Sequence, residues 1–412
     1  MAESYTNPAA MEPMLPAANR ERLAGLAFEI LQESGRLAGM VRSPWVYQEV
    51  VNLVRGMNCY YSNLIEGHRT SPRDIERAMA RDFSDQPGER ANQLLAFAHM
   101  EVERELEEML EGGRDVYSTE FVRDIHRRFY ERLPEEFQIA RSVSGASYRI
   151  VPGSLRDFMV DVGRHTPPHF EALGAFLKRF RDVYSSLEFP GTECLVVVAA
   201  AHHRLAWIHP FGDGNGRVAR LHSQALLRHY GVAGLGLWTL SRGMARRRGD
   251  YYRYLEMADR ERVNDFDGRG NLSDAGLGAF CVFFLETMLD QVRFMSGVLD
   301  VSQLRTRVER YFQYSEEKNH RQAFASILRV LVDEGEIPRA RVREITGKGA
   351  TVAADIVKKG LEAGYFRSPS PKGVLRVAFP EKMREVLFPK LYFSAEYGGG
   401  DAAEGQIFKT YD

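Results

Sequence analysis

The stretch HPFGDGNGRVAR, from His209 to Arg220, decides most of what this sequence predicts. Beyond it, apolar residues recur at helical spacing until Gly231, so we expect a helix that begins near residues 214–216. The first N–H groups of a helix are unpaired and carry partial positive charge, and glycines let a phosphate approach that backbone closely. The stretch therefore predicts a phosphate-binding loop at a helix N-terminus.

The side chains of this stretch indicate a reaction. Arg217 and Arg220 lie one turn into the predicted helix on one face, where they can reach further phosphate oxygens. Asp213 alone would repel phosphate, so it is better explained as a ligand of Mg²⁺ that bridges phosphate oxygens. His209 precedes the loop, where a base can take a proton from an attacking hydroxyl. Together these residues predict phosphoryl or nucleotidyl transfer. The alternative is a glycine-rich helix start beside a histidine buried for packing.

The twelve residues match H-x-F-x-[DE]-G-N-G-R-x-x-R, the signature of the Fic family, at every fixed position. The chain resembles this family over roughly residues 34–299, which include the apolar stretch CLVVVAAAHHRLAWI before the motif and DYYRYLEMAD after it. Fic proteins mostly transfer AMP from ATP to a hydroxyl of a target protein. The resemblance therefore implies a protein adenylyltransferase, a nucleotidyltransferase that uses ATP and Mg²⁺ or Mn²⁺.

The resemblance also implies roles for single residues. His209 would deprotonate the target Ser, Thr or Tyr, Asp213 would hold the metal, and Phe211 would anchor the loop in the core. The implied catalytic residues are His209, Asn215 and Arg217. The implied nucleotide-binding residues are Gly214, Asn215, Gly216, Arg217, Arg220 and Tyr252. Among them, Asn215 would meet the α-phosphate and the two arginines the outer phosphates.

A second stretch, SNLIEG, matches the family's inhibitory pattern [ST]-x-x-x-E-[GN] with Ser62, Glu66 and Gly67. Ser62 and Glu66 are four residues apart and share one helix face. The resemblance implies that Glu66 pairs with Arg220 and obstructs the γ-phosphate, since a carboxylate competes with phosphate for the same positive charge. An exposed helical glutamate is the alternative. The same Glu can position a water that removes AMP, so transferase and de-AMPylase both stay open.

Other segments between residues 101 and 208 carry simpler interpretations. The hairpin expected at residues 146–153 would be the flap that clamps a target segment by main-chain pairing, or else an ordinary surface hairpin. The charged stretch at residues 101–113 is interpreted as the solvated face of a helix. His202 and His203, adjacent on an apolar helix, point in different directions and are interpreted as structural.

The C-terminal part changes character after residue 316. Three short helices followed by a hairpin around residues 371–373 predict a winged helix-turn-helix. Residues 321–379 hold eleven Lys and Arg against six Asp and Glu. A nucleotide-sensing DNA-binding regulator is therefore the second hypothesis, with Lys348, Thr351 and Lys358 as contacts. A dimerisation or target-docking module is the alternative for the same segment.

The sequence as a whole predicts a mainly α protein, a Fic-type helical bundle with a β-hairpin flap and the winged helix. The expected divisions are a flexible tail (1–20), a helical region with the inhibitory motif (21–112), the catalytic core (113–315), the winged helix domain (318–392) and a second flexible tail (393–412).

Composition limits the classes of partner. The 412 residues carry a net charge of −1, so no global field attracts nucleic acid or membrane. Three scattered cysteines are expected to be reduced core residues. No apolar N-terminal stretch and no apolar run of membrane length are recognised, so a cytoplasmic protein is expected. ATP, an unknown target protein or the chain itself, DNA, and a second copy in a homodimer are the candidate partners.

Overall fold

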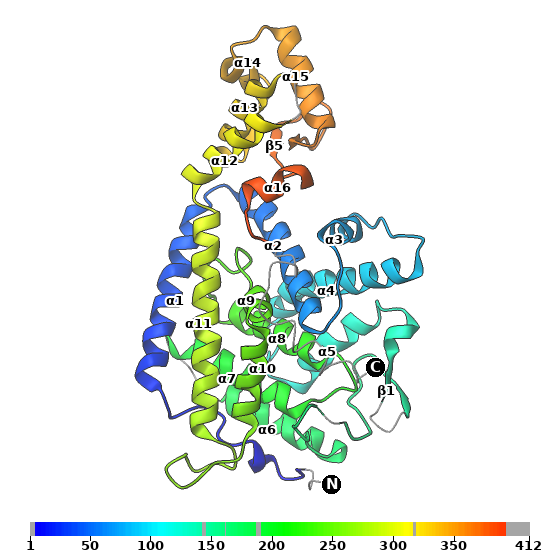
Figure 1. Cartoon of the computed structure of the whole chain (residues 1–412), viewed down its shortest axis with the longest axis vertical. Coiled ribbons are helices and arrows are strands. Elements are labelled where there is room, and N and C mark those ends of the chain that lie inside the picture. The colour runs from blue at the N-terminus through cyan, green and yellow to red at the C-terminus, as the bar shows by residue number, and fades with distance from the viewer. Residues whose placement is uncertain (1–4, 142–145, 161, 187–190, 316–318, 393–412) are drawn as a thin grey trace.

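The computed structural model describes residues 5–141, 146–160, 162–186, 191–315 and 319–392. The fold is mainly helical, as predicted, and a bundle of helices lies below a smaller C-terminal unit (Figure 1). The α-helices are α1 (Arg20–Met40), α2 (Pro44–Ile65), α3 (Pro72–Met79), α4 (Pro87–Glu111), α5 (Thr119–Tyr130), α6 (Leu173–Ser185), α7 (Glu193–Ile208), α8 (Asn215–His229), α9 (Leu240–Arg246), α10 (Arg248–Asp259), α11 (Asp274–Val298), α12 (Val301–Tyr314), α13 (Arg321–Glu334), α14 (Arg341–Thr346), α15 (Ala350–Glu362) and α16 (Glu381–Leu387). Short 3-10 helices span Pro8–Met11, Glu135–Gln138 and Phe170–Ala172.

The core of the bundle is built around α7, whose residues are apolar on nearly every side. It packs against α6, α8 and α11, so the apolar helix expected before the motif lies in the core. His202 bonds the hydroxyls of Ser223 and Tyr251 at 2.8 Å each, and His203 lies 3.2 Å from the Leu255 carbonyl. Both histidines are fully buried and bonded within the protein, in agreement with a structural role.

Helix α11 corrects one expectation about membranes. Among the described residues it is the one helix long and apolar enough to cross a membrane by length and composition. Its most apolar window is 78% buried inside the fold, where it packs against α1, α10 and α7. A core helix passes the same test, so the finding is weak evidence for a membrane span.

The flexible tail expected at residues 1–20 is wrong for residues 5–19. Met11 and Met14 are 0% and 3% exposed, and the Asp274 carboxylate accepts the N–H groups of two residues that precede α1. The segment lacks α-helical periodicity because it is irregular apart from the 3-10 helix Pro8–Met11, but Met11 and Met14 are buried one by one against the bundle.

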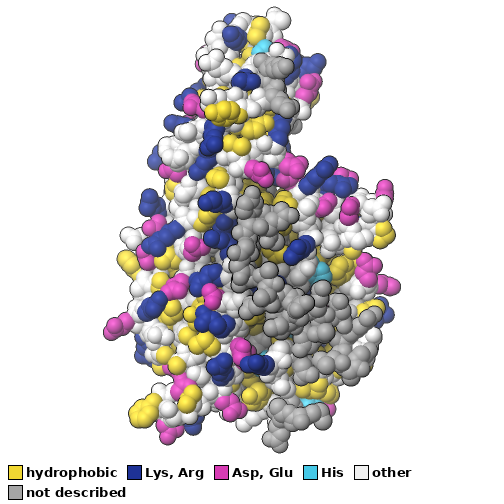
Figure 2. Space-filling model, in the orientation of Figure 1, with side chains coloured by type: hydrophobic (Ala, Val, Ile, Leu, Met, Phe, Trp, Pro, Cys, Tyr) yellow, Lys and Arg dark blue, Asp and Glu magenta, His cyan; other side chains and the backbone are white. Residues whose placement is uncertain are grey.

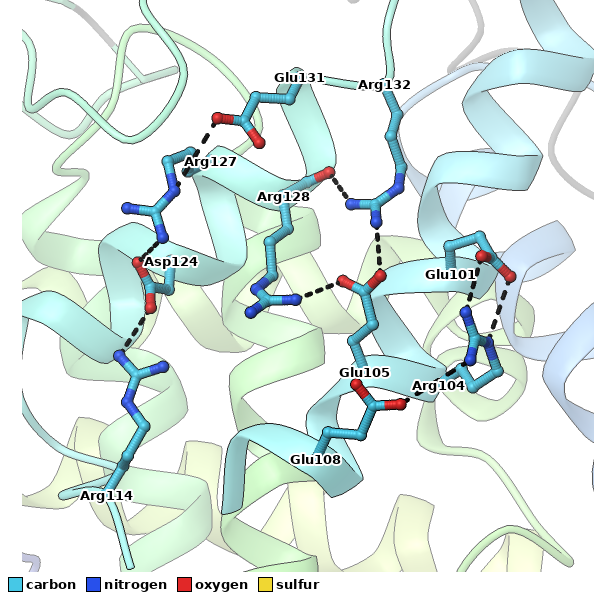
Figure 3. A network of polar contacts seen from close by, with 10 residues as sticks. All are labelled: Glu101, Arg104, Glu105, Glu108, Arg114, Asp124, Arg127, Arg128, Glu131 and Arg132. Atoms are coloured by element: carbon cyan, nitrogen blue, oxygen red, sulfur yellow. Dashed lines mark hydrogen bonds and ion pairs between the residues drawn. The ribbon is translucent and has the colours of Figure 1, made fainter. Parts of the chain in front are cut away.

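The charged stretch at residues 101–113 is not simply a solvated face. It ends α4, and Glu103 and Glu105 are 4% and 8% exposed. Figure 3 shows Glu105 between two arginines of the neighbouring helix α5 and its C-terminal end, 2.8 Å from Arg128 and 2.5 Å from Arg132. The local pattern of charge could not indicate this burial, because the partners come from another helix.

The expected hairpin at residues 146–153 is displaced. The strands that pair are β1 (Ile139–Arg141) and β2 (Ser147–Arg149), antiparallel, with Ala140 opposite Tyr148. Only the second strand falls within the predicted range, and part of the connection lies outside the described residues. The displacement arises because the first strand follows a 3-10 turn and carries no turn signal of its own.

The C-terminal unit contains the three predicted helices, α13, α14 and α15, and the predicted hairpin, β4 (Phe366–Arg367) with β5 (Leu375–Val377). The sequence missed β3 (Glu336–Ile337), which completes a sheet in the order β3-β5-β4. After α16 the chain returns to α2, where the Tyr61 hydroxyl donates to the Leu391 carbonyl at 2.7 Å. The tail expected from residue 393 lies outside the described residues.

Candidate active site

The motif loop joins the C-terminus of α7 to the N-terminus of α8. Gly214 precedes α8 with φ +79°, and a side chain there would lie 2.7 Å from the Tyr130 ring. The predicted helix start is therefore confirmed, and only glycine fits at this position. The N–H groups of Asn215, Gly216 and Arg217 have no acceptor within the helix. They form the positive end that the sequence predicts.

The side chain of Asn215 closes the loop. Its Oδ1 accepts the Phe211 N–H and its Nδ2 donates to the Phe211 carbonyl, both at 2.9 Å. Phe211 is fully buried and stacks on His126 at 3.9 Å, which agrees with an anchoring role. Because both amide atoms of Asn215 are engaged, its backbone N–H is the group left to meet a phosphate.

His209 is held in an uncommon conformation at the end of α7. Its φ of 49° and ψ of 60° are left-handed, which is uncommon for any residue but glycine. Burial, with smaller contributions from the neighbouring His165 and Arg156, lowers the pKa of His209 to about 3. The imidazole is therefore neutral at physiological pH and able to accept a proton.

Asp213 lies at the opening of the loop with its side chain 52% exposed. Its Oδ2 accepts the Tyr130 hydroxyl at 2.8 Å and lies 3.6 Å from Arg217. Burial alone would raise the pKa of Asp213, but Arg217, the Tyr130 hydroxyl and the Gly214 N–H outweigh it and lower the pKa. The carboxylate is thus ionised.

The described residues contain no cluster of three or more His, Cys, Asp or Glu that could hold a metal. Asp213 still fits the usual arrangement for Mg²⁺, in which one carboxylate and the substrate phosphates share the ion.

Among the described residues, the Arg217 guanidinium has hydrogen-bond donors without acceptors. Its side chain is 4% exposed, and within the described structure its buried Nε and Nη1 have no hydrogen-bond partner. A buried donor without an acceptor is costly. These two atoms therefore suit an anionic ligand at the start of α8.

Glu66 fills the space beside Arg220. Its Oε1 accepts from Arg220 Nη2 at 2.6 Å, while Arg220 also donates to the Ser62 hydroxyl at 2.9 Å and the Ser62 carbonyl at 3.0 Å. A side chain added at Gly216 would collide with the Glu66 carboxylate, so this carboxylate lies against the first turn of α8. Burial opposes ionisation of Glu66, but Arg220 and Arg217 outweigh it and lower the pKa. The structure therefore brings the two sequence motifs together as one charged contact.

Residues 116–227 match the family model described as the Fic/DOC family. This chain carries a Fic/DOC domain. The protein adenylyltransferase Fic of Nematostella vectensis is 31% identical over 134 residues, which are 32% of this chain and 30% of the relative. That of Drosophila mojavensis is 29% identical over 154 residues, 37% of this chain and 30% of the relative. The chain thus spans about three tenths of the length of these curated relatives.

A solved Fic family protein from Desulfovibrio desulfuricans G20 has a similar fold. The TM-score is 0.54 at 17% identity, and the match covers 89% of this chain and 98% of that one. At this identity the likeness concerns the fold alone. It extends beyond the matched Fic domain into the helices on either side.

Two further predicted residues lie near the Fic motif. Tyr252, on α10, donates to the Ile65 carbonyl at 3.2 Å, next to Glu66. Gly67 follows with φ +86°, a conformation that glycine adopts without strain. Tyr251 instead faces the core and bonds His202. The predicted residues on α2, α8 and α10 therefore converge on one place.

Sequence reasoning missed residues that support the Fic loop from other segments. Arg156 is 4% exposed and donates to the His209 carbonyl at 2.9 Å. His126 Nδ1 accepts the Gly153 N–H at 2.9 Å, and Tyr130 contacts Asp213. The supporting contacts of Arg156 and His126 involve backbone atoms, so nothing in the pattern of residue types could have signalled them.

Proposed function

We propose that the protein is a protein adenylyltransferase that moves AMP from ATP to a side-chain hydroxyl of a target protein. One observation carries the proposal: a neutral His209 stands at one end of a loop whose other end, the N-terminus of α8, presents unpaired N–H groups and the free donors of Arg217. The names of the curated relatives support the same activity.

In the proposed reaction the target oxygen attacks the α-phosphorus while His209 takes the hydroxyl proton. The new bond joins that oxygen to the α-phosphorus, the bond between the α-phosphorus and the bridging oxygen breaks, and pyrophosphate leaves. The N-terminus of α8 stabilises charge on the α-phosphate, and Arg217 and Arg220 bind the outer phosphates. Asp213 would hold Mg²⁺, which neutralises phosphate charge when bound.

The pairing of Glu66 with Arg220 supports self-inhibition. Arg220 cannot offer the same N–H to a phosphate while it donates to Glu66 at 2.6 Å. The carboxylate also places negative charge against the first turn of α8, where a phosphate would bind. We expect the wild-type chain to bind ATP in an unproductive position.

The test is incorporation of AMP from α-labelled ATP into protein, in a lysate, by three forms of the full chain. Glu66→Gly should label proteins strongly, the wild type weakly, and the double variant Glu66→Gly/His209→Ala not at all. Absence of label from Glu66→Gly with ATP, GTP, UTP and CTP would exclude the activity. A Glu66-dependent removal of AMP from labelled protein would favour the de-AMPylase instead.

DNA binding by the C-terminal unit is a second candidate, favoured by the exposure of the predicted contacts. Lys348, Thr351 and Lys358 are all exposed at the start and along one side of α15. A gel shift whose affinity falls steeply with salt is the expected result, and no shift at low salt would rule it out. A homodimer and a cytoplasmic location stay predictions, and light scattering tests the first.

A further inference from the structure

Arg156 is a buried guanidinium that binds backbone carbonyls from three segments. Nε donates to the His209 carbonyl at 2.9 Å, Nη1 to that of Phe158 at 2.9 Å and Nη2 to that of Pro168 at 2.5 Å. Its own N–H donates to the Pro210 carbonyl at 3.0 Å. Two consecutive residues of the motif loop are therefore fixed by one residue from outside it.

The bond to His209 acts on the strained part of the loop. A left-handed backbone at a residue other than glycine costs free energy and persists only where neighbours over-determine it. The Arg156 guanidinium holds the carbonyl that follows this conformation, and burial of that cation lowers its pKa to about 10, so it keeps its charge at neutral pH.

The hydrogen bond from Arg156 to the Phe158 carbonyl links the motif loop to the β1–β2 hairpin. The Tyr148 ring on β2 stacks on the Phe158 ring at 3.8 Å, and a side chain at Gly212 would lie 2.9 Å from that ring. Phe158 thus lies between the hairpin and the motif loop. Arg156 fixes the backbone of this residue and of His209 with one planar group, whose donors have a rigid relative geometry.

We propose that Arg156 is a positioning residue that sets the angle of the His209 imidazole relative to the β1–β2 hairpin. It acts through backbone carbonyls and does not touch the nucleotide. The inference rests on the proposed function for its kinetic consequence: the variants should slow transfer and weaken use of the target, while binding of ATP at α8 is unaffected.

The test uses the full chain in the Glu66→Gly background, with Arg156→Lys and Arg156→Gln. Arg307→Lys is the matched control, because Arg307 also donates to backbone carbonyls, those of Val298 and Leu387, but in the C-terminal part of the fold. Both Arg156 variants should lower kcat by about 10- to 100-fold, with KM for ATP within about twofold of the parent. Arg307→Lys should change neither.

A second readout does not depend on activity. The ¹³Cα shift of His209, assigned by its loss in His209→Gln, should indicate a left-handed backbone in the parent and move in both Arg156 variants. An unchanged shift, an unchanged kcat, or a rise in KM for ATP alone would each overturn the proposal. If the parent transfers no AMP, the proposed function fails and the shift alone decides on Arg156.

Folding of the variants is checked by thermal unfolding. If both Arg156 variants unfold, the rate at which the Arg156 Nε–H exchanges with solvent hydrogen in the wild type tests the proposal instead. Slow exchange supports the bonded guanidinium, and exchange at the rate of a free arginine overturns the proposal.

Discussion

His209 shows how one residue is prepared for its chemistry by its surroundings. Burial disfavours the imidazolium, and the positive charge of Arg156 adds to this effect. The lowered pKa, about 3, keeps the ring neutral across the whole range in which an unperturbed histidine would titrate. The ring is therefore unprotonated at neutral pH, and the same low pKa makes it a weaker base than a free histidine.

The pH dependence of transfer follows from this pKa. For Glu66→Gly with saturating Mg²⁺, kcat/KM should not fall between pH 8 and pH 5, because His209 gains its proton only at lower pH. The measurement is initial AMP incorporation at constant ionic strength. A fall of kcat/KM to half its value at pH 8 near pH 6.5 would contradict a buried, neutral His209.

Glu66 is an acid, so a lowered pKa has the opposite consequence and keeps its side chain charged. Its pKa lies below the usual value of 4.5, so the folded state holds it ionised and the pair with Arg220 is present above that value. The pairing is lost only as pH falls through the lowered pKa. We expect the wild-type chain to stay inhibited from pH 8 to pH 5, and Glu66→Gln to incorporate more AMP than the wild type at pH 7. Equal incorporation by both forms would show that the carboxylate charge does not inhibit.

Two elements meet at the candidate site, the end of α2 and the start of α8, and they were predictable to different degrees. The start of α8 follows from glycines and helical periodicity, whereas the pairing of Glu66 with Arg220 was implied only by the resemblance to the Fic family. Arg156 could not be predicted, because its partners are backbone carbonyls of segments up to 53 residues apart. The first strand of the hairpin was missed for lack of a local signal, and the burial of Glu105 because its arginines lie on another element.

The first turn of α8 depends on Gly214. Gly214→Ala should lower the free energy of unfolding by at least about 2 kcal/mol, since it combines a left-handed backbone with a collision against Tyr130. Gly231→Ala is the matched control at the other end of α8, with φ +65° and open space around it, and should cost about 1 kcal/mol. Urea unfolding measures both values. Equal costs would contradict the close packing of Tyr130 on the loop.

At the scale of the molecule, α2 connects the C-terminal unit to the candidate active site. Its N-terminal half contacts that unit through Trp45, because the guanidinium carbon of Arg376 lies 3.3 Å from the centre of the Trp45 ring. Its C-terminal end carries Glu66. Between them, the Tyr61 hydroxyl holds the Leu391 carbonyl. In Figure 1, α2 runs from the C-terminal unit down into the bundle, and Figure 2 shows the narrow upper unit above the broad lower one. Helix α2, which ends at Glu66, is therefore held in part by the C-terminal part of the chain.

Weakening this contact should weaken inhibition. Tyr61→Phe removes the buried hydrogen bond to the Leu391 carbonyl, worth about 1 kcal/mol, between α2 and the segment after α16. We expect AMP incorporation above that of the wild type and below that of Glu66→Gly, because Glu66 itself is retained. Tyr314→Phe, at an exposed position of α12, is the control. AMP incorporation equal to that of the wild type would show that the contact between Tyr61 and Leu391 does not influence inhibition.

The proposed activity is transfer of the AMP part of ATP to protein. The most direct measurement compares purified Glu66→Gly incubated with a lysate and either α-labelled or γ-labelled ATP. We expect stable protein label from the α-position beyond that of the lysate alone, no γ-label beyond what the kinases of the lysate produce by themselves, and loss of the α-label in Glu66→Gly/His209→Ala. γ-Label above the background of the lysate alone, or α-label that persists without His209, would contradict AMP transfer by this site.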